Sequence, residues 1–192
     1  MERKKKVAVL LAEGFEEIEA LTVVDIVRRS NIECDLVSIK NEMVKSCHDV
    51  WVKTDKGILN INKDDYTMIV LPGGLPGADN LRDCEELILW IKEFANNPDK
   101  YIAAICAAPQ VLAKADIIKG KEVTSYPADE FKKILNAARY IDDKNKTVVI
   151  DGNIITSRGP ATAFDFAYKI VEILGGNVEI LKKGMLYDLY VK

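Results

Sequence analysis

Short, uninterrupted apolar runs alternate along this chain with segments of helical spacing, and this alternation restricts the possible folds more than any other feature. The clearest runs lie at residues 7–11, 68–71 and 101–105. A run without polar interruption is typical of a strand that is buried on both faces of a sheet. Strands that are separated by helices pair in parallel through right-handed crossovers. The sequence therefore predicts an α/β fold, a doubly wound sandwich with a mostly parallel central sheet and helices on both faces.

Local patterns predict the remaining elements. Residues 34–39 alternate like a strand, residues 44–52 indicate an extended piece or a hairpin arm, and residues 148–150 and 154–156 flank a turn signal. Helical spacing predicts helices at residues 16–29, 84–95, 111–115, 128–138 and 160–174, the last being the final helix and ended by two glycines. The chain has 192 residues, 48% of them hydrophobic, and shows no internal repeat or linker. We therefore expect a single domain over residues 1–192.

Charge and cysteine content exclude several classes of protein. The 27 Lys and Arg residues against 30 Asp and Glu residues leave a formal charge of -3, so a basic nucleic-acid-binding surface is not indicated. No apolar stretch is long enough to span a bilayer, and the N-terminus has no signal-peptide core. The cysteines are Cys34, Cys47, Cys84 and Cys106, and none forms a C-x-x-C pair. With His48 as the only histidine, we expect a cytoplasmic protein with reduced thiols, no Cys/His cluster and no metal site.

One cysteine lies where a predicted strand gives way to a helix. Cys106 follows the strand at residues 101–105, and Pro109 suits the first turn of a helix. The positive end of the helix dipole would lower the pKa of this thiol and favour the thiolate. Ala104 and Ala108 occupy the positions that glycines fill in a nucleophile elbow. Taken alone, the segment fits a nucleophile and a buried structural cysteine equally well.

Two further loops leave the same edge of the predicted sheet, where doubly wound folds bind ligands. Gly73 and Gly74 would let backbone N–H groups approach a ligand, and with the N–H of Ala107 they could form an oxyanion hole facing Cys106. A plain tight turn is the alternative. Glu19 lies at the head of an apolar helical stripe, where burial would raise its pKa and make it an acid/base partner for a thiol. The alternative is an edge residue that reaches solvent.

Neighbouring polar residues have simpler interpretations. Glu16 and Glu17 lie in the first turn of the predicted helix, where acidic side chains complement the helix dipole. Cys47 and His48 lie in a polar stretch, which indicates an exposed thiol. Nothing in the sequence brings His48 to Cys106, so a Cys–His catalytic dyad is not expected.

Four motifs together resemble the DJ-1/ThiJ/PfpI superfamily in order and spacing over essentially the whole chain. They are residues 13–19 (EGFEEIE), 71–74 (LPGG), 103–109 (AAICAAP) and 156–160 (TSRGP). The resemblance is nearest to the DJ-1 (ThiJ) branch, and it implies a flavodoxin-like sandwich, a homodimer and a reactive Cys106 hydrogen-bonded by Glu19. It also implies that Gly74 and Ala107 supply backbone donors at the site. The positions at which relatives form their dimer interface correspond here to Asp25, Arg29 and the loop around His48.

Two departures from the family pattern bear on the chemistry. In the PfpI protease-like branch a histidine directly follows the nucleophile, whereas this chain has Ala107 there, which argues against a Cys–His–acid peptidase. Several DJ-1 relatives have a histidine where this chain has Tyr126. Because tyrosine has a high reference pKa, it is a poor base near neutral pH, and proton transfer would fall to Glu19, water or the thiolate. Gly73 and Tyr126 are expected to form part of the wall of the site.

The resemblance implies two functional classes, and both use Cys106 and Glu19. The first is a cofactor-independent glyoxalase or deglycase, in which the Cys106 thiolate attacks the aldehyde carbon of a methylglyoxal-type dicarbonyl or its adduct. The second is a peroxide-responsive redox sensor or chaperone-like stress protein, in which Cys106 is oxidised to the sulfinate. The expected partners are small reactive aldehydes or glycated protein and a second copy of the chain, with no membrane and no nucleic acid.

Overall fold

A seven-stranded sheet forms the centre of the molecule, with the strand order β10-β11-β7-β6-β1-β2-β5. The structure is a computed structural model, and it describes residues 5–189. The strands span Lys6–Leu11 (β1), Glu33–Ser38 (β2), Lys56–Gly57 (β5), Met68–Leu71 (β6), Tyr101–Ile105 (β7), Val148–Asp151 (β10) and Ile154–Ser157 (β11). All neighbouring pairs are parallel except β10 with β11 at one edge. The predicted mostly parallel sheet is confirmed.

The central strands are apolar on both faces because a hydrophobic core lies against each face. In β1, Val7, Val9 and Leu11 belong to one core, whereas Ala8 and Leu10 belong to the other. All five side chains are fully buried. Successive side chains of a strand point to opposite faces, so a strand between two cores has no position that favours a polar residue.

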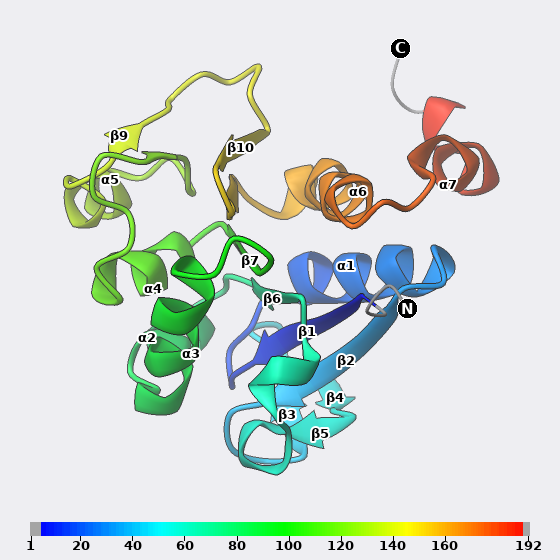
Figure 1. Cartoon of the computed structure of the whole chain (residues 1–192), viewed down its shortest axis with the longest axis horizontal. Coiled ribbons are helices and arrows are strands. Elements are labelled where there is room, and N and C mark those ends of the chain that lie inside the picture. The colour runs from blue at the N-terminus through cyan, green and yellow to red at the C-terminus, as the bar shows by residue number, and fades with distance from the viewer. Residues whose placement is uncertain (1–4, 190–192) are drawn as a thin grey trace.

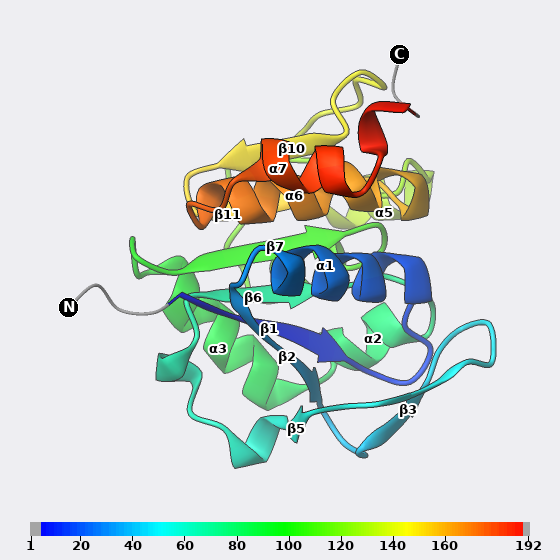
Figure 2. The ribbon, with the colours of Figure 1, turned by 90° about the vertical axis from the view of Figure 1, so that its right-hand side faces the viewer.

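Helices cover both faces of the sheet, as Figures 1 and 2 show. One layer consists of α1 (Glu17–Arg29) and α6 (Ala163–Ile173), with α7 (Val178–Gly184) packed against α6. The other layer consists of α2 (Gly77–Arg82), α3 (Glu85–Ala95) and α4 (Pro109–Lys114), with α5 (Asp129–Ile134) against α4. Within residues 5–189, no helix has the length and apolar character needed to cross a membrane.

The helix predicted at residues 160–174 ends where predicted but differs from the prediction at its start and in its place along the chain. It begins as a 3₁₀ turn, Pro160–Thr162, before α6 continues the segment. It ends before Gly175, whose φ of 81° suits glycine at a helix terminus. It is not the final helix, because α7 follows, capped by the Asn177 side chain that accepts from the Ile180 N–H at 3.2 Å.

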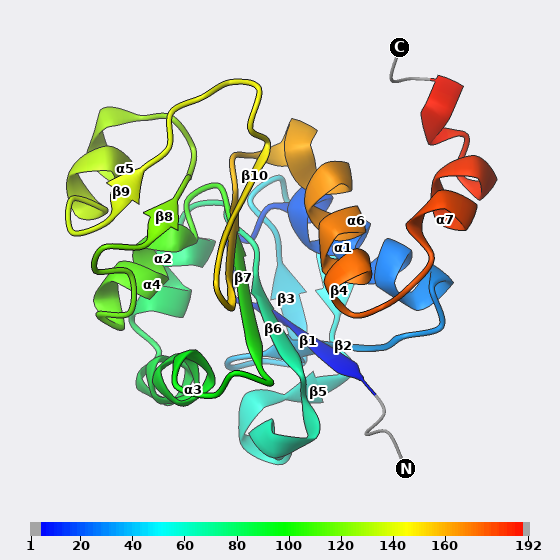
Figure 3. The same cartoon turned by 45° about the horizontal axis from the view of Figure 1, so that its top comes forward.

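Several short elements escaped prediction because they have too few residues for a periodic pattern. The segment predicted at 44–52 as an extended piece or a single hairpin arm instead contains parts of both arms of a hairpin, Met43–Lys45 (β3) and Trp51–Lys53 (β4), and the helix predicted at 128–138 shortens to α5. The unpredicted elements include the short strands Glu122–Val123 (β8) and Arg139–Tyr140 (β9) and the 3₁₀ turns Ile58–Asn60, Lys63–Asp65 and Tyr187–Leu189. Figure 3 shows the small sheet of β8 and β9 beside α5.

Three loops meet at the carboxyl ends of β1, β6 and β7. The first two are joined directly, since the N–H of Glu16 donates to the Gly73 carbonyl at 3.0 Å and the N–H of Gly77 donates to the Gly14 carbonyl at 3.2 Å. Gly14 has a φ of 87°, and a Cβ there would lie 2.5 Å from Pro76 Cδ. Only glycine allows this approach, which seats both loops beside the turn after β7.

Candidate functional site

Cys106 occupies the sharp turn between β7 and α4. Its φ is 63°, in the left-handed region that residues with a side chain rarely adopt. Two backbone hydrogen bonds hold this conformation, one from the Cys106 N–H to the Ser157 carbonyl at 3.1 Å and one from the Tyr126 N–H to the Cys106 carbonyl at 2.9 Å. A strained backbone held in this way is often found at active sites. The geometry is that of the elbow that the sequence indicated.

Glu19 projects from the first turn of α1 into the interior and is fully buried. Its Oε2 accepts a hydrogen bond of 2.8 Å from the Gly73 N–H. Its Oε1 has no hydrogen-bond partner among residues 5–189. Burial raises the pKa of this carboxyl to about 7, against the opposing effects of Cys106 and the Gly73 N–H. The predicted burial of Glu19 is therefore confirmed, and the carboxyl titrates near neutral pH.

The glycines of the second loop leave room for the thiol and the carboxyl to meet. A Cβ on Gly73 would lie 2.7 Å from Cys106 Cβ and 2.7 Å from Glu19 Oε2. Gly74 has a φ of 84°, and its N–H and that of Ala107 interact with the Cys106 sulfur and lower its pKa. The structure thus brings together all five residues of the predicted centre, and the catalytic role of each stays a prediction.

The N–H groups at the turn lower the thiol pKa as predicted, but the net shift is upward. Burial raises the pKa of Cys106, and the charge on Glu19 raises it further, outweighing the N–H groups of Ala107 and Gly74. Helix α4 has only six residues, so its dipole is small. Thiol and carboxyl titrate as a coupled pair, so the two titration steps belong to the pair. Near neutral pH the Glu19 carboxyl is present in both forms, one able to accept a proton from the thiol and the other able to donate one.

The structure places Tyr126 beside Cys106 through its backbone N–H, while its side chain is half exposed. Its ring lies near Gly159, where a Cβ would be 3.6 Å from Tyr126 Cδ2. Asp25 and Arg29 lie elsewhere, on the exposed face of α1, where Arg29 Nε donates to Asp25 Oδ2 at 2.7 Å. The predicted roles of Tyr126 as site wall and of Asp25 and Arg29 as interface residues stay predictions.

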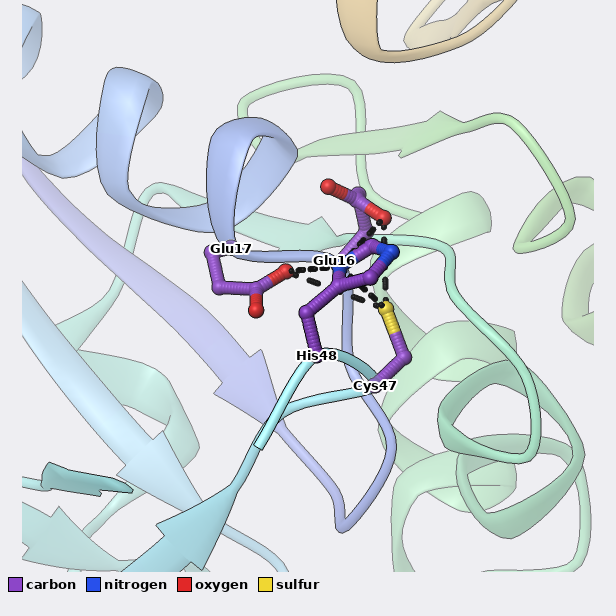
Figure 4. Close-up of side chains that lie close together, drawn as sticks. All are labelled: Glu16, Glu17, Cys47 and His48. Atoms are coloured by element: carbon purple, nitrogen blue, oxygen red, sulfur yellow. Dashed lines mark hydrogen bonds and ion pairs between the residues drawn. The ribbon is translucent and has the colours of Figure 1, made fainter. Parts of the chain in front are cut away.

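A second group of chemically active side chains lies next to this site, at the start of α1. Glu16, Glu17, Cys47 and His48 bring their ligand atoms within 4.8 Å of one another (Figure 4). The expectation that the chain has no Cys/His cluster is therefore wrong. The group could not be predicted from the sequence because its two halves lie 31 positions apart. The sequence shows only two adjacent pairs, Glu16–Glu17 and Cys47–His48, and the fold brings these pairs together.

Charge interactions in this second group differ from those at Cys106. Burial works to raise the pKa of Glu17, but hydrogen bonds from His48 and Ser46 overcome it and lower the pKa to about 2. The same contact with Glu17 raises the pKa of His48. Burial, with the nearby charge of Glu16, raises the pKa of the Cys47 thiol to about 12. All four cysteines of the chain are free, as predicted.

Comparisons with known proteins cover the whole of this architecture. The DJ-1/PfpI family model matches residues 5–173. Drosophila melanogaster protein dj-1beta is 40% identical over 185 residues, 95% of this chain and 97% of that protein. The Danio rerio Parkinson disease protein 7 homolog is 36% identical over 174 residues, 90% of each chain.

Solved structures agree with these sequence similarities. The crystal structure of Drosophila melanogaster DJ-1beta has a TM-score of 0.89 at 41% identity and covers 95% of this chain and 98% of that one. Oxidized Toxoplasma gondii DJ-1 has a TM-score of 0.85 at 32% identity with the same coverage. The residues that the family model matches, 5–173, include every loop that builds the Cys106 site.

Proposed function

This chain belongs to the DJ-1/PfpI family, and on that premise we propose that it is a cysteine-dependent, cofactor-independent glyoxalase or deglycase that acts on methylglyoxal-type dicarbonyls or their protein adducts. The fold is the flavodoxin-like α/β sandwich. The observation that carries the proposal is the pairing of Cys106, strained at the elbow, with a fully buried Glu19 that titrates near neutral pH. A thiol nucleophile and a matched acid/base are the two groups that this chemistry needs.

The first step is attack by the thiol on the aldehyde. A bond forms from Cys106 Sγ to the aldehyde carbon while the ionised Glu19 carboxylate takes the thiol proton. The carbonyl electron pair moves onto the aldehyde oxygen, where the N–H groups of Gly74 and Ala107 would hold the developing charge. Glu19 then gives the proton to that oxygen, which leaves a hemithioacetal and a carboxylate.

The second step moves hydrogen between neighbouring carbons. Glu19 removes the proton from the former aldehyde carbon, and the electron pair passes to the adjacent ketone oxygen, which takes up a proton to give an enediol. Protonation at the former ketone carbon, with loss of the hydroxyl proton from the sulfur-bearing carbon, gives a thioester. Water hydrolyses the thioester, which releases a 2-hydroxy acid, lactate in the case of methylglyoxal, and restores the thiol. One carbon is oxidised as its neighbour is reduced, so the sum is addition of one water and no redox cofactor is required. Tyr126, half exposed, is not needed as a base.

A second candidate function is a peroxide-responsive thiol. It is favoured by the unpartnered buried Glu19 Oε1 and by the oxidised state named for the similar Toxoplasma gondii protein. Each of two peroxide molecules would transfer one oxygen to Cys106 and leave as water, which gives first a sulfenic and then a sulfinic acid. The protonated Glu19 carboxyl would then donate to a sulfinate oxygen. The same residues serve both candidates.

A homodimer and a cytoplasmic location complete the proposal. The predicted interface uses α1, with Asp25 and Arg29, and the loop around His48. Two large apolar side chains on these elements are exposed, Ile18 by 52% and Trp51 by 58%, and such side chains often mark an interaction surface. Light scattering of wild type and Trp51→Asp would test the dimer, which the charged substitution should weaken.

Lactate formation from methylglyoxal tests the enzymatic proposal directly. Wild type should form lactate, whereas Cys106→Ser should not and Cys84→Ser should keep full activity. Wild-type turnover no higher than that of Cys106→Ser would rule out the enzyme. Mild peroxide followed by mass spectrometry tests the second candidate, which fails if Cys34, Cys47 or Cys84 is oxidised before Cys106.

A further inference from the structure

We propose that Glu16, Glu17, Cys47 and His48 form a binding site for one zinc ion, separate from the Cys106 centre. Each residue offers one ligand atom, and the four atoms are the two carboxylate Oε2 atoms, the Cys47 sulfur and the imidazole Nδ1 of His48 (Figure 4). Thiolate, imidazole and carboxylate are the three ligand types that zinc takes in proteins, and four ligands make its usual coordination number.

Most of the printed separations of these atoms are close to the edges of a zinc tetrahedron. Zinc–ligand bonds of about 2.0–2.3 Å place neighbouring ligand atoms about 3.3–3.6 Å apart. Here Cys47 Sγ lies 3.2 Å from Glu16 Oε2, 3.3 Å from His48 Nδ1 and 3.8 Å from Glu17 Oε2. His48 Nδ1 lies 2.8 Å from Glu17 Oε2 and 3.7 Å from Glu16 Oε2. To complete the geometry, His48 Nδ1 and Glu17 Oε2 would move apart by about 0.5 Å, and the two carboxylate oxygens, which lie within 4.8 Å of each other, would adjust to the same edge length.

Four potential ligand atoms converge on one point in this cluster. The Cys47 sulfur lies 3.2 Å and 3.8 Å from the two carboxylate Oε2 atoms and 3.3 Å from His48 Nδ1. Without a metal ion, the Cys47 thiol can donate to Glu16 and a protonated His48 Nδ1 can donate to Glu17. A cation would take the place of these two protons, and the thiol would lose its proton on binding.

The backbone around the cluster holds the ligands in place. The N–H of Cys47 donates to the Phe15 carbonyl at 2.9 Å, and Phe15 and Ser46 form an isolated parallel bridge. Ser46 Oγ donates to Glu17 Oε1 at 2.6 Å, so the carboxylate that would bind through Oε2 is oriented through its other oxygen. Outer-shell contacts of this kind are typical of metal sites.

The side chains of this cluster differ in how far they are buried. The side chains of Glu16 and Glu17 are 11% and 15% exposed, whereas that of His48 is 68% exposed. Within one chain the ion would therefore face solvent on the His48 side, which is also the side of the proposed dimer interface. The sulfur ligand favours zinc over magnesium or calcium, which prefer oxygen ligands alone. This inference does not depend on the proposed activity at Cys106.

Metal binding by the reduced, chelator-treated chain tests the site. Zinc is titrated in competition with a chromophoric chelator, and cobalt is titrated in parallel because thiolate coordination gives a near-ultraviolet charge-transfer band. Wild type should take up one equivalent and show the band. Cys47→Ser should abolish the band and weaken zinc binding more than about 100-fold, since even outer-shell partners cost about 10- to 100-fold. Ser46→Ala should weaken binding by about that smaller factor.

Matched variants distinguish this site from the other cysteine site. Cys106→Ser removes one thiol as Cys47→Ser does, and it should leave both the band and the zinc affinity unchanged. A band that survives in Cys47→Ser and disappears in Cys106→Ser would overturn the proposal, because the metal would then sit at Cys106. Absence of any cobalt–thiolate band in wild type would also overturn it, leaving a hydrogen-bonded ion-pair network. Circular dichroism of each variant checks that the fold is intact.

Discussion

Glu19 projects from the first turn of α1 toward Cys106 in the interior, whereas Glu17, two residues earlier, faces Cys47 and His48 near the surface. Both are glutamates beside a cysteine. Burial raises the pKa of Glu19 to about 7, but hydrogen bonds from His48 and Ser46 outweigh burial at Glu17 and lower its pKa to about 2. The two carboxyls therefore differ in the role that they suit, since one can exchange protons at neutral pH and the other stays ionised.

The two regions also differ in what builds them. At Cys106 the partners of the thiol are backbone N–H groups of Gly74 and Ala107 and one buried carboxyl. At Cys47 they are side-chain atoms of Glu16, Glu17 and His48. Backbone donors suit an anion that develops during a reaction, whereas converging side-chain lone pairs suit a cation. Two glutamates that lie two positions apart in the first turn of α1 thus belong to different sites, one to the candidate acid/base centre and the other to the candidate metal site.

Exchanging each glutamate for glutamine should separate the two regions most sharply. Glu19→Gln removes the acid/base and should lower kcat/KM for methylglyoxal by about 100- to 10,000-fold. Glu17→Gln leaves the Cys106 centre intact and should change kcat/KM little, while it weakens zinc binding. Parallel rate assays and chelator competition on both variants provide the measurement. Equal losses of activity in both variants would show that the two regions work as one site.

Crowding the space between thiol and carboxyl should give the next largest effect. In Gly73→Ala the new methyl would lie 2.7 Å from both Cys106 Cβ and Glu19 Oε2, so the pair must move apart. A displacement of about 1 Å can lower an enzyme's rate about 100-fold, and we expect a loss of that size with zinc affinity unchanged. Gly184→Ala is the control, because nothing lies within 4 Å of a Cβ at that position. Full activity in Gly73→Ala would place the reaction elsewhere.

The sequence predicted the frame and the Cys106 centre because both follow local patterns. Apolar runs such as 68–71 identify strands, and the carboxyl ends of parallel strands meet at one edge, which brought Cys106, Gly73 and Glu19 together in prediction. The sequence-based predictions failed where a property depends on opposing energetic contributions or on contacts between distant parts of the chain. The thiol pKa was misjudged because the dipole of a six-residue helix is smaller than the cost of burial. The Glu16–Cys47 cluster was missed because a bridge 31 positions along the chain creates it.

The pH dependence of activity should follow Glu19. Since the ionised carboxylate accepts the thiol proton, kcat/KM should rise about tenfold per pH unit below the pKa of about 7 and level off above it. Glu17→Gln should keep this profile, because the pKa of about 2 at Glu17 lies far below the range. Rate measurements from pH 5 to 8.5 are sufficient. A profile that is flat across pH 7 would mean that Glu19 is not the base.

The smallest expected effect is on stability, and it has opposite signs at the two glutamates. The pKa of Glu19 is raised from 4.5 to about 7 on folding, so its contribution is full below pH 4.5 and is lost as the pH rises through 7, by at most about 1.4 kcal/mol per pH unit. The pKa of Glu17 is lowered from 4.5 to about 2, so its contribution is present above pH 4.5 and is lost as the pH falls toward 2. Relative to wild type, Glu19→Gln should therefore gain stability between pH 5 and 7, whereas Glu17→Gln should gain it only below pH 4.5. Urea unfolding of the three proteins across this range measures both slopes, and slopes of the same sign would contradict the contrast between the two regions.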